Sequence, residues 1–328
     1  MNILEKTGKV GAAGVAVLTT LILAVIKLAL GIFIGSFAVI AEAIHSGMDL
    51  FSALIGFFAV RQSSVPPDDS HPFGHGKYET MAGGFESIIL LIASGSIVFF
   101  SIREFLSGPH PIEAGIGIWV MLGTGAVNFG IARYLFWASK KYDSFAIEGN
   151  AWHLMADALP SLGVVMGLMA VKFLNWYWAD SLIAMLIGIY IGLVGFRLIG
   201  RAFRGLTDHS LPRDEKAKIK SIIQSHYPQV LEFHKLRTRK SGNERHIDLH
   251  IVMKRNTPLD LVHELCDQIE DEIKKCFPSC KILVHVEPCQ VLGICEKGKC
   301  PLVNKDSDYL CPLDEPNFRG RHLKLSKS

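Results

Sequence analysis

The sequence predicts an all-α membrane domain of six helices, followed by a cytoplasmic α+β domain of the αββαβ, ferredoxin-like or metallochaperone-like type. Two observations predict this division. Hydrophobic residues make up 49% of the 328 residues, charged residues only 20%, and the mean hydropathy is positive. The charges are also unevenly distributed: long apolar runs extend to about Arg204, and a soluble composition begins at Thr207. We therefore predict a membrane domain over residues 1–206, a cytoplasmic domain over 207–290 and a flexible, cysteine-containing tail over 291–328.

Six apolar stretches are long enough to cross a bilayer, which requires about 20 residues. They lie near residues 10–33, 37–61, 81–106, 113–136, 148–171 and 180–203. The first stretch is too long for a cleavable signal peptide, and a second apolar stretch follows it almost at once. We therefore expect a multi-pass protein of a bacterial inner membrane or plasma membrane, surrounded by membrane lipid.

Lysine and arginine predict the orientation of these spans. They precede the first span, bracket the loop after the second, and lie near the ends of the fourth and sixth: Lys6, Lys9, Arg61, Lys77, Arg133, Lys140, Lys141, Arg197, Arg201 and Arg204. Cytoplasmic loops carry the excess of positive residues, so both termini are expected in the cytoplasm. The net charge of +3, without a basic stripe, gives no indication of a nucleic-acid partner.

The soluble part alternates helical and strand patterns. A helix is predicted over 212–226, strands over 230–239 and 246–253 around a turn at 241–243, a second helix over 257–277 and a third strand over 281–286. About 80 residues in this order can bury a core of their own.

Two of the apolar stretches repeat one motif, in which a histidine precedes an aspartate by four residues. The motifs are His45-Ser-Gly-Met-Asp49 and His153-Leu-Met-Ala-Asp157. Residues four apart share one face of a helix, so each motif presents an imidazole and a carboxylate together. Two such helices would supply two nitrogens and two oxygens, the ligand set of a tetrahedral divalent-metal site. Ionisable groups at membrane depth usually mark an ion pathway, although one motif alone is equally compatible with a hydrogen bond between helices.

Together with three further segments, these motifs resemble those of the cation diffusion facilitator family of divalent-metal transporters. The segments are Asp68-Asp-Ser-His-Pro-Phe-Gly-His75-Gly-Lys, His234-Lys-Leu-Arg-Thr-Arg-Lys-Ser-Gly and His285-Val-Glu-Pro. The resemblance covers about residues 10–290. It implies six membrane helices, a cytoplasmic domain through which the chain forms a homodimer, and proton-coupled efflux of a divalent metal from the cytoplasm.

Zinc is the expected transported and structural metal. Two nitrogens and two oxygens suit zinc, and the chain resembles the zinc carriers of the family in having histidine at position 45. Iron(II), cobalt, cadmium and manganese are alternatives, because nitrogen and oxygen donors discriminate weakly among them. Metal and protons compete for the same ligand atoms, so protons are the expected counter-substrate of an alternating-access exchange.

Other function classes fit the sequence less well. A metal channel would transport without proton dependence and is a weaker alternative. A membrane zinc hydrolase predicts an HExxH-type motif, and none occurs, so we do not expect an enzyme. A sensor that used only the soluble domain would leave both intramembrane motifs unexplained.

A second metal site is predicted in the loop after the second span. Asp68, His71 and His75 lie among prolines and glycines that would stiffen and turn this loop. The resemblance assigns metal binding to this loop too, with Asp69 the less favoured ligand. Three ligands leave one position open, which predicts weaker binding. A solvated polar loop is the alternative.

A third site is predicted in the cytoplasmic domain. Its candidate ligands are His234, His250, His263, His285 and Glu287. His285 and Glu287 alternate on one strand and share a face, whereas His246 and Asp248 share the parity of His250 and compete with it. The resemblance favours His250, His285 and the acid, with His263 as an extra ligand. Many relatives have aspartate where this chain has Glu287, which leaves the number of metals open; surface histidines without a metal are the alternative.

All seven cysteines lie in the soluble part. Those from the third predicted strand onward are speculative metal ligands: Cys289, Cys295, Cys300 and Cys311. On the predicted topology they face the reducing cytoplasm, where disulfides are rare. Their spacing lacks the paired CxxC of a zinc ribbon, so a flexible tail with incidental cysteines is an equally open interpretation.

Three polar residues near the motifs are weaker candidates. Glu42 could tune the histidine of the first motif or pair with Lys27. Glu86, in the third span, is expected to pair with a neighbouring helix, and Asn150 could orient the imidazole of the second motif.

Overall fold

A computed structural model describes residues 3–34, 37–107, 116–174, 176 and 178–289 of the chain. These residues form two compact units. The first runs to His209 and also contains Lys240–Glu244, and the second comprises Ser210–Arg239 and the described residues from Arg245 onward. Each unit has its own hydrophobic core.

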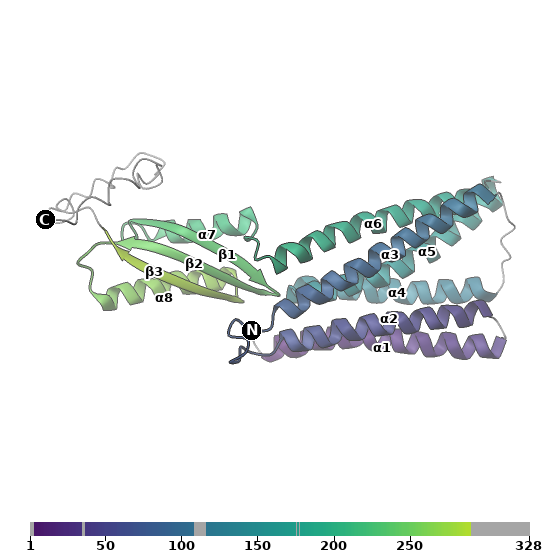
Figure 1. Cartoon of the computed structure of the whole chain (residues 1–328), viewed down its shortest axis with the longest axis horizontal. Helices are drawn as coiled ribbons and strands as arrows, with labels where there is room; N and C mark the ends of the chain where they lie inside the picture. Colours follow the sequence, from purple (N-terminus) through teal and green to yellow (C-terminus); the bar gives the residue numbers. More distant parts are fainter. Residues whose placement is uncertain (1–2, 35–36, 108–115, 175, 177, 290–328) are drawn as a thin grey trace. The chain divides into compact units, whose positions relative to one another are not determined.

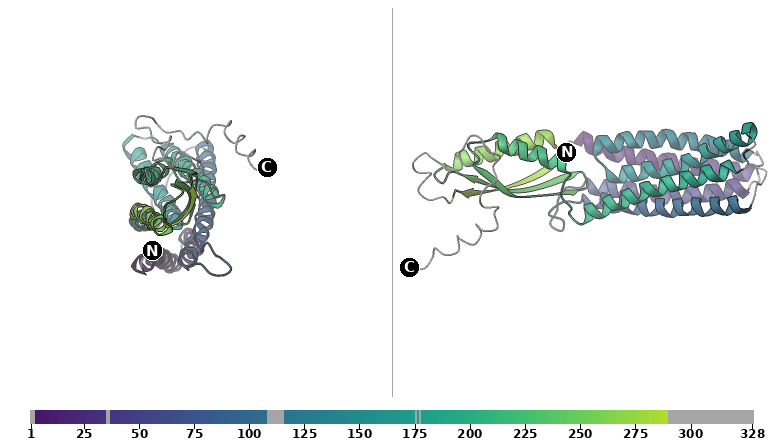
Figure 2. Two further views of the ribbon diagram at one scale, coloured as in Figure 1. Left: turned by 90° about the vertical axis from the view of Figure 1, so that its left-hand side faces the viewer. Right: turned by 90° about the horizontal axis from the view of Figure 1, so that it is seen from above.

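The first unit is a bundle of six long helices that run side by side (Figures 1 and 2). The helices are α1 (Ile3–Ile34), α2 (Phe37–Ser63), α3 (Lys77–Ser107), α4 (Ile116–Tyr142), α5 (Phe145–Leu174) and α6 (Ala179–Leu206). α1 packs on α2, α3 on α6 and α4 on α5, while α5 also contacts α2, α3 and α6. The prediction of six helices is confirmed, and α5 is the helix that touches most of its neighbours.

Four of these helices are long and apolar enough over their described residues to cross a membrane: α1, α2, α3 and α6. The other two, α4 and α5, fall short of that measure. α5 carries Glu148, His153 and Asp157 in its first half, which lowers its hydropathy. The polar residues of a predicted site thus lie within this helix.

Small residues let the helices of the bundle approach closely, as is usual in membrane bundles. Alanines fill much of the core shared by α1, α2, α4 and α5. Where α3 meets α5, a Cβ on Gly83 would lie 2.4 Å from the ring of Phe145, and a Cβ on Gly149 would lie 3.1 Å from Cβ of Glu86. These two glycines bring Glu86 against α5.

The second unit is a three-stranded sheet with two helices on one of its faces (Figures 1 and 2). Its elements are α7 (Arg213–Ser225), β1 (Glu232–Ser241), β2 (Glu244–Met253), α8 (Leu259–Cys276) and β3 (Cys280–Pro288). The strand order is β1-β2-β3, and β2 pairs in parallel with β3. The predicted αββαβ order is confirmed.

The period-two pattern of β2 explains which face the helices cover. Ile247, Leu249 and Ile251 are at most 1% exposed and pack on α7 and α8, where Ile219 and Ile269 are fully buried. Each such side chain contributes about 1.5–3 kcal/mol by leaving water. The histidines and acids of even number on β2 therefore point to the other face of the sheet.

Strand β1 departs from the predicted alternation. Phe233 and Leu236, three residues apart, both pack on the core, and Lys235 between them has φ of 50°. One extra residue in a strand shifts the alternation by one, as a bulge does. The strand also begins at Glu232 instead of the predicted 230, because Val230 donates its N–H to the carbonyl of His226 in the turn after α7.

Candidate metal centres

The two histidine–aspartate motifs lie on α2 and α5, and the structure brings three of their four polar side chains together. Asp49, His153 and Asp157 each offer a ligand atom, and these atoms lie within 4.8 Å of one another. Nε2 of His153 is 3.1 Å from Oδ1 of Asp49 and 3.9 Å from Oδ2 of Asp157. Asp49 and His153 are buried and Asp157 is half-buried. One nitrogen and two oxygens around a point can hold a divalent cation and leave a fourth position open.

The fourth predicted ligand, His45, lies beside this cluster and not in it. Its Nε2 is 3.8 Å from Oδ1 of Asp49, one turn further along α2, and its side chain is 57% exposed. The helical spacing thus places the two residues on one face, as predicted, while the ring of His45 keeps an outward orientation.

A third helix also reaches the cluster. Glu86 of α3 is 1% exposed, its Oε1 accepts a hydrogen bond of 2.9 Å from Ser52 of α2, and its Oε2 lies 3.9 Å from Nδ1 of His153. The sequence predicted only that Glu86 would pair with another helix. In the structure it lies against His153 of the motif on α5. The signal in the sequence was an ionisable residue within an apolar span.

Two other polar residues from the sequence analysis have partners of their own. Lys27 donates hydrogen bonds to Glu42 at 2.9 Å and to Ser46 at 2.8 Å, so the expected alternative of a Lys27–Glu42 pair is the one observed. Asn150 lies close to Gly56, where a Cβ would be 3.1 Å from its amide nitrogen. The amide of Asn150 therefore faces α2. The predicted role of Asn150, to orient the imidazole of His153, fits Glu86 better, because Glu86 lies 3.9 Å from that ring.

The loop between α2 and α3 gathers its three predicted ligands. Asp68, His71 and His75 present ligand atoms within 4.8 Å of one another. Nδ1 of His71 and Nε2 of His75 lie 3.1 Å and 3.3 Å from the two oxygens of Asp68. Gly74, at φ of 82°, supplies the left-handed turn that brings His75 back toward Asp68. His75 is buried, and its Nδ1 has no hydrogen-bond partner among the described residues.

The electrostatics of this loop favour a charged carboxylate. The backbone N–H of His71 donates to Asp68 at 2.6 Å and lowers the pKa of that carboxyl group below its usual value. Asp68 is therefore ionised and available to a cation at neutral pH.

The cytoplasmic domain gathers three of its five predicted ligands on the sheet face opposite the helices. His234, His250 and Glu287 offer ligand atoms within 4.8 Å of one another. Nδ1 of His250 is 2.7 Å from Oε1 of Glu287, and Nε2 of His234 is 3.3 Å from Oε2. The slip at Lys235 occurs directly after His234, so the bulge of β1 helps to aim this side chain.

Hydrogen bonding also sets the charge of Glu287. The bond from His250, and then the nearby imidazole of His234, lowers the pKa of this carboxyl group. Because its folded-state pKa lies below its unfolded value, the ionised group stabilises the fold at pH above the unfolded pKa. This contribution is lost as the pH falls through the folded pKa.

The remaining cytoplasmic candidates differ in position. His285 sits opposite His250 in the register of β2 and β3, with ring centroids 4.5 Å apart, and its Nε2 is 3.9 Å from Oε1 of Glu287. His263 was predicted as an extra ligand, but it lies on α8, 78% exposed beside Asp267. α8 covers the face of the sheet that β2 turns away from the histidines, so His263 lies apart from the cluster.

Among the four cysteines proposed as speculative metal ligands, Cys289 falls within the described residues. It is buried directly after the end of β3. Cys295, Cys300 and Cys311 lie outside the described residues.

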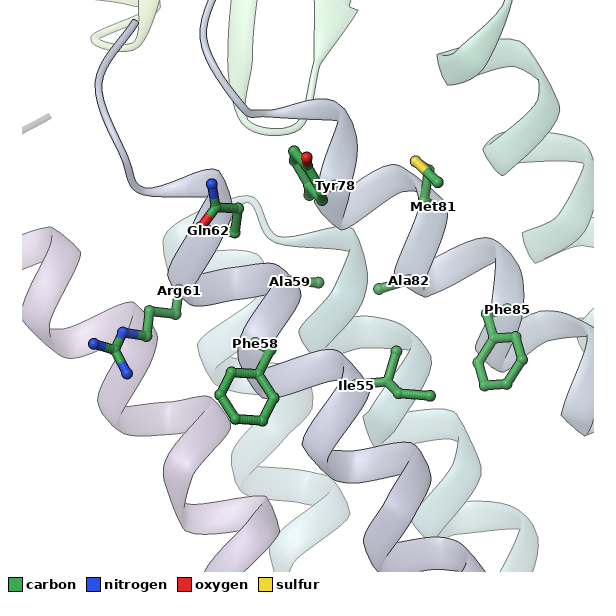
Figure 3. A pocket seen from close by; sticks show the side chains of 9 residues that line it. All are labelled: Ile55, Phe58, Ala59, Arg61, Gln62, Tyr78, Met81, Ala82 and Phe85. Carbon is green, nitrogen blue, oxygen red and sulfur yellow. The ribbon is translucent and has the colours of Figure 1, made fainter. Parts of the chain in front are cut away.

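A groove of about 780 Å³ lies between α2 and α3 (Figure 3). Tyr78 lines it and also stacks against His75 of the loop cluster, with ring centroids 6.0 Å apart. Most of its lining is apolar, including Phe58 of α2 and Phe85 of α3. Arg61 points away from α3 in Figure 3. No predicted metal ligand lines this groove, so the polar clusters are the chemically competent sites.

Two family models cover most of the chain. The model described as "Cation efflux transmembrane domain" matches residues 14–207, and the one described as "Cation efflux protein, cytoplasmic domain" matches residues 211–289. The chain belongs to the cation efflux family, the cation diffusion facilitators.

Relatives of this cation efflux protein match about four fifths of its length. The cation-efflux pump FieF of Yersinia enterocolitica is 35% identical over 284 residues, which are 84% of this chain and 93% of the pump. An uncharacterized transporter of Synechocystis is 31% identical over 257 residues, 78% of this chain and 83% of its own. The solved metal-bound C-terminal domain of the CzcD transporter from Thermotoga maritima is 24% identical and covers 25% of this chain and 100% of that domain, with a TM-score of 0.23.

Membership fixes the class of this cation efflux protein. It is a transporter of divalent metal cations and not an enzyme, and it is a multi-pass protein of the inner membrane. These conclusions confirm the predicted fold class, function class and location.

Proposed function

We propose that this cation efflux protein exports zinc from the cytoplasm in exchange for protons, through a site formed by His45, Asp49, His153 and Asp157. The observation that carries this proposal is the buried cluster of Asp49, His153 and Asp157, whose ligand atoms lie within 4.8 Å of one another. Buried charges without a partner cost free energy, so a cluster of acids and an imidazole inside a bundle is maintained for a function.

The donor set supports zinc as the substrate. Zinc binds readily to imidazole nitrogen and carboxylate oxygen in four-coordinate sites. The cluster provides three such donors. His45 lies 3.8 Å from Asp49, and in the proposal it completes the set by a change of rotamer. The same donors also bind iron(II), cobalt, cadmium and manganese, so transport rates must be compared among these metals to test the preference for zinc.

The same atoms support exchange against protons. A metal requires an unprotonated imidazole nitrogen and ionised carboxylates, so each bound proton lowers the affinity for metal. Metal loaded from the cytoplasmic side would be displaced by protons from the other side after the helices rearrange. The cytoplasmic position of both termini, predicted from Lys and Arg, belongs to this proposal.

Proteoliposomes test the proposal directly. We expect zinc flux to rise when a proton gradient opposes it, because protons on the far side clear the site. The assay measures the initial rate for zinc, cobalt, cadmium, iron(II) and manganese in turn, with and without the gradient. Zinc flux that ignores the gradient would instead favour a channel, and preferred flux of another metal would replace zinc as the substrate.

We also propose that the loop and cytoplasmic clusters bind metal, and that the cytoplasmic domain holds two copies of the chain together. The loop cluster has three ligands and exposed Asp68 and His71, which favour ready exchange of its ion. The cytoplasmic cluster of His234, His250 and Glu287, with His285 nearby, would stiffen its sheet when metal binds and so report the cytoplasmic metal level.

Two histidines of the cytoplasmic domain make a matched pair for testing this cluster. We expect His250→Ala to lower the zinc bound per purified chain by the content of one site, because His250 contributes to the cluster. We expect His263→Ala to leave the bound zinc unchanged, because this side chain is 78% exposed and lies beside Asp267, on a different element from the ligands of the cluster. Elemental analysis after dialysis measures both. Equal zinc in the two variants would contradict the assignment.

A further inference from the structure

The two carboxylate oxygens of the buried residue Glu86 differ in their hydrogen bonding. Its side chain is 1% exposed, and Ser52 donates to Oε1 at 2.9 Å. Oε2 has no hydrogen-bond partner among the described residues. A buried unsatisfied oxygen is costly and calls for an explanation in a folded protein.

The surroundings of Oε2 explain why this oxygen lacks a hydrogen bond. In the described part of the chain, the basic group found within 4.0 Å of this carboxylate is the imidazole of His153, with Nδ1 at 3.9 Å. The close approach of Gly149 on α5 to Glu86 on α3 sets this distance, because a Cβ at Gly149 would lie only 3.1 Å from Cβ of Glu86. Backbone packing therefore directs the free oxygen toward one ring nitrogen.

The two nitrogens of His153 face different partners. Nε2 lies 3.1 Å from Asp49 and 3.9 Å from Asp157, on the side of the carboxylate cluster. Nδ1 faces Glu86. A neutral imidazole carries its single proton on one nitrogen, and a metal takes the other. For Nε2 to bind a metal, the proton must be on Nδ1, where it needs an acceptor.

We propose that Glu86 is a positioning residue for metal binding: it accepts the Nδ1 proton of His153 and so holds the imidazole in the tautomer and orientation that present Nε2 to the ion. This inference rests on the proposed function of the cluster. A carboxylate behind a metal-binding histidine fixes the ring and increases its strength as a ligand, and loss of such a partner typically lowers metal affinity about 10–100-fold.

Glu86 lies on a third helix, so its contact with His153 connects α3 to the site. His153 is on α5, Asp49 is on α2, and Glu86 is on α3, where it also accepts the hydrogen bond from Ser52 of α2. The carboxylate therefore connects three helices at the site. The orientation of the ligand ring depends on how α3 packs against α5, so α3 takes part in the site without supplying a ligand.

Three variants test the inference, in a background where His71→Ala and His250→Ala remove the other two metal clusters. Glu86→Gln keeps an oxygen acceptor but no charge, and Glu86→Leu keeps neither. Ser87→Ala is the matched control, because Ser87 is buried on the same helix and its hydroxyl donates to the carbonyl of Gly83, within that helix. Each protein is measured for zinc transport in proteoliposomes and for cobalt binding in detergent by the ligand-field absorption of Co²⁺.

We expect the KM for zinc to rise about 10-fold in Glu86→Gln and further, toward about 100-fold, in Glu86→Leu, with kcat little changed. The cobalt affinity should fall in the same order, with a shifted absorption band, while Ser87→Ala matches the parent protein. An unchanged KM and cobalt spectrum in Glu86→Leu would overturn the inference. So would equal losses of kcat and protein yield with an unaltered cobalt band, because that pattern belongs to a purely structural carboxylate.

The transport assay and the cobalt-binding assay together distinguish a failure of this inference from a failure of the proposed function. If the parent protein moves no zinc, or moves it without regard to protons, the proposed function fails. Cobalt titration still decides the role of Glu86 in that case, because it measures binding alone. If transport is as proposed and the Glu86 variants behave as the parent does, only the inference fails.

Discussion

We expect Asp157→Ala to abolish transport of zinc, the proposed substrate. Asp157 supplies one of the three ligand atoms that lie within 4.8 Å in the bundle. Loss of a partner behind a ligand already costs about 10–100-fold in affinity, so loss of a ligand should cost at least about 100-fold. The measurement is the initial rate of zinc uptake into proteoliposomes at a fixed proton gradient.

Two further variants make the Asp157 result interpretable. Asp157→Asn keeps the size of the side chain. This variant should also fail to transport zinc, because an uncharged amide is a poorer metal ligand than a carboxylate. Asp69→Ala removes an exposed acid that lies outside all three clusters and should transport normally. Size-exclusion chromatography confirms that each variant is folded. Normal zinc flux in Asp157→Ala or Asp157→Asn would remove Asp157 from the site.

The second large effect concerns stability: Lys9→Met should destabilise the bundle by about 3–5 kcal/mol. Lys9 forms an ion pair with Glu79 in which both side chains are fully buried, and Glu79 also accepts hydrogen bonds from Ser63 at 2.5 Å and Ser144 at 2.7 Å. Removing the ammonium group leaves a buried carboxylate charge without its counter-ion. The midpoint of thermal unfolding in detergent should fall by about 10 °C.

A double variant distinguishes this pair from a general effect of the substitution. Lys9→Met combined with Glu79→Gln should recover most of the lost stability, because replacing both members of a buried ion pair by neutral groups is often nearly neutral. The two serine hydroxyls can still donate to the amide oxygen of Gln. Lys140→Met, at an exposed position of the same bundle, should change the midpoint little. A double variant no more stable than Lys9→Met would show that the pair is not the cause.

Much of the fold was available from the sequence because it follows from local patterns. Long apolar runs predicted the six helices, and the alternation around Ile247, Leu249 and Ile251 predicted the central strand. Where a local feature broke the pattern, the prediction slipped: the left-handed residue Lys235 shifts the alternation of β1, and the turn after α7 delays the start of that strand. Such features depend on how the backbone closes against the rest of the domain.

The candidate sites divide in the same way. Helical spacing alone put His45 beside Asp49 and His153 beside Asp157, and the strand parity of His285 and Glu287 put both on one face. The exclusion of His263 could not be read from spacing, because it depends on which face of the sheet α8 covers. Residues on one element share a face by periodicity, whereas residues on different elements meet only through packing.

Hydropathy, period and spacing act over a few residues of chain, and they were sufficient to predict the membrane bundle, the αββαβ domain and the residue types of three candidate metal sites. Packing between the helices set what those local patterns leave open. It gathered Asp49, His153 and Asp157 while leaving His45 outside, buried Lys9 against Glu79, and placed Glu86 behind His153. Each of these contacts joins residues from different helices, and their distances are set by close packing through small residues such as Gly149, which no local pattern records.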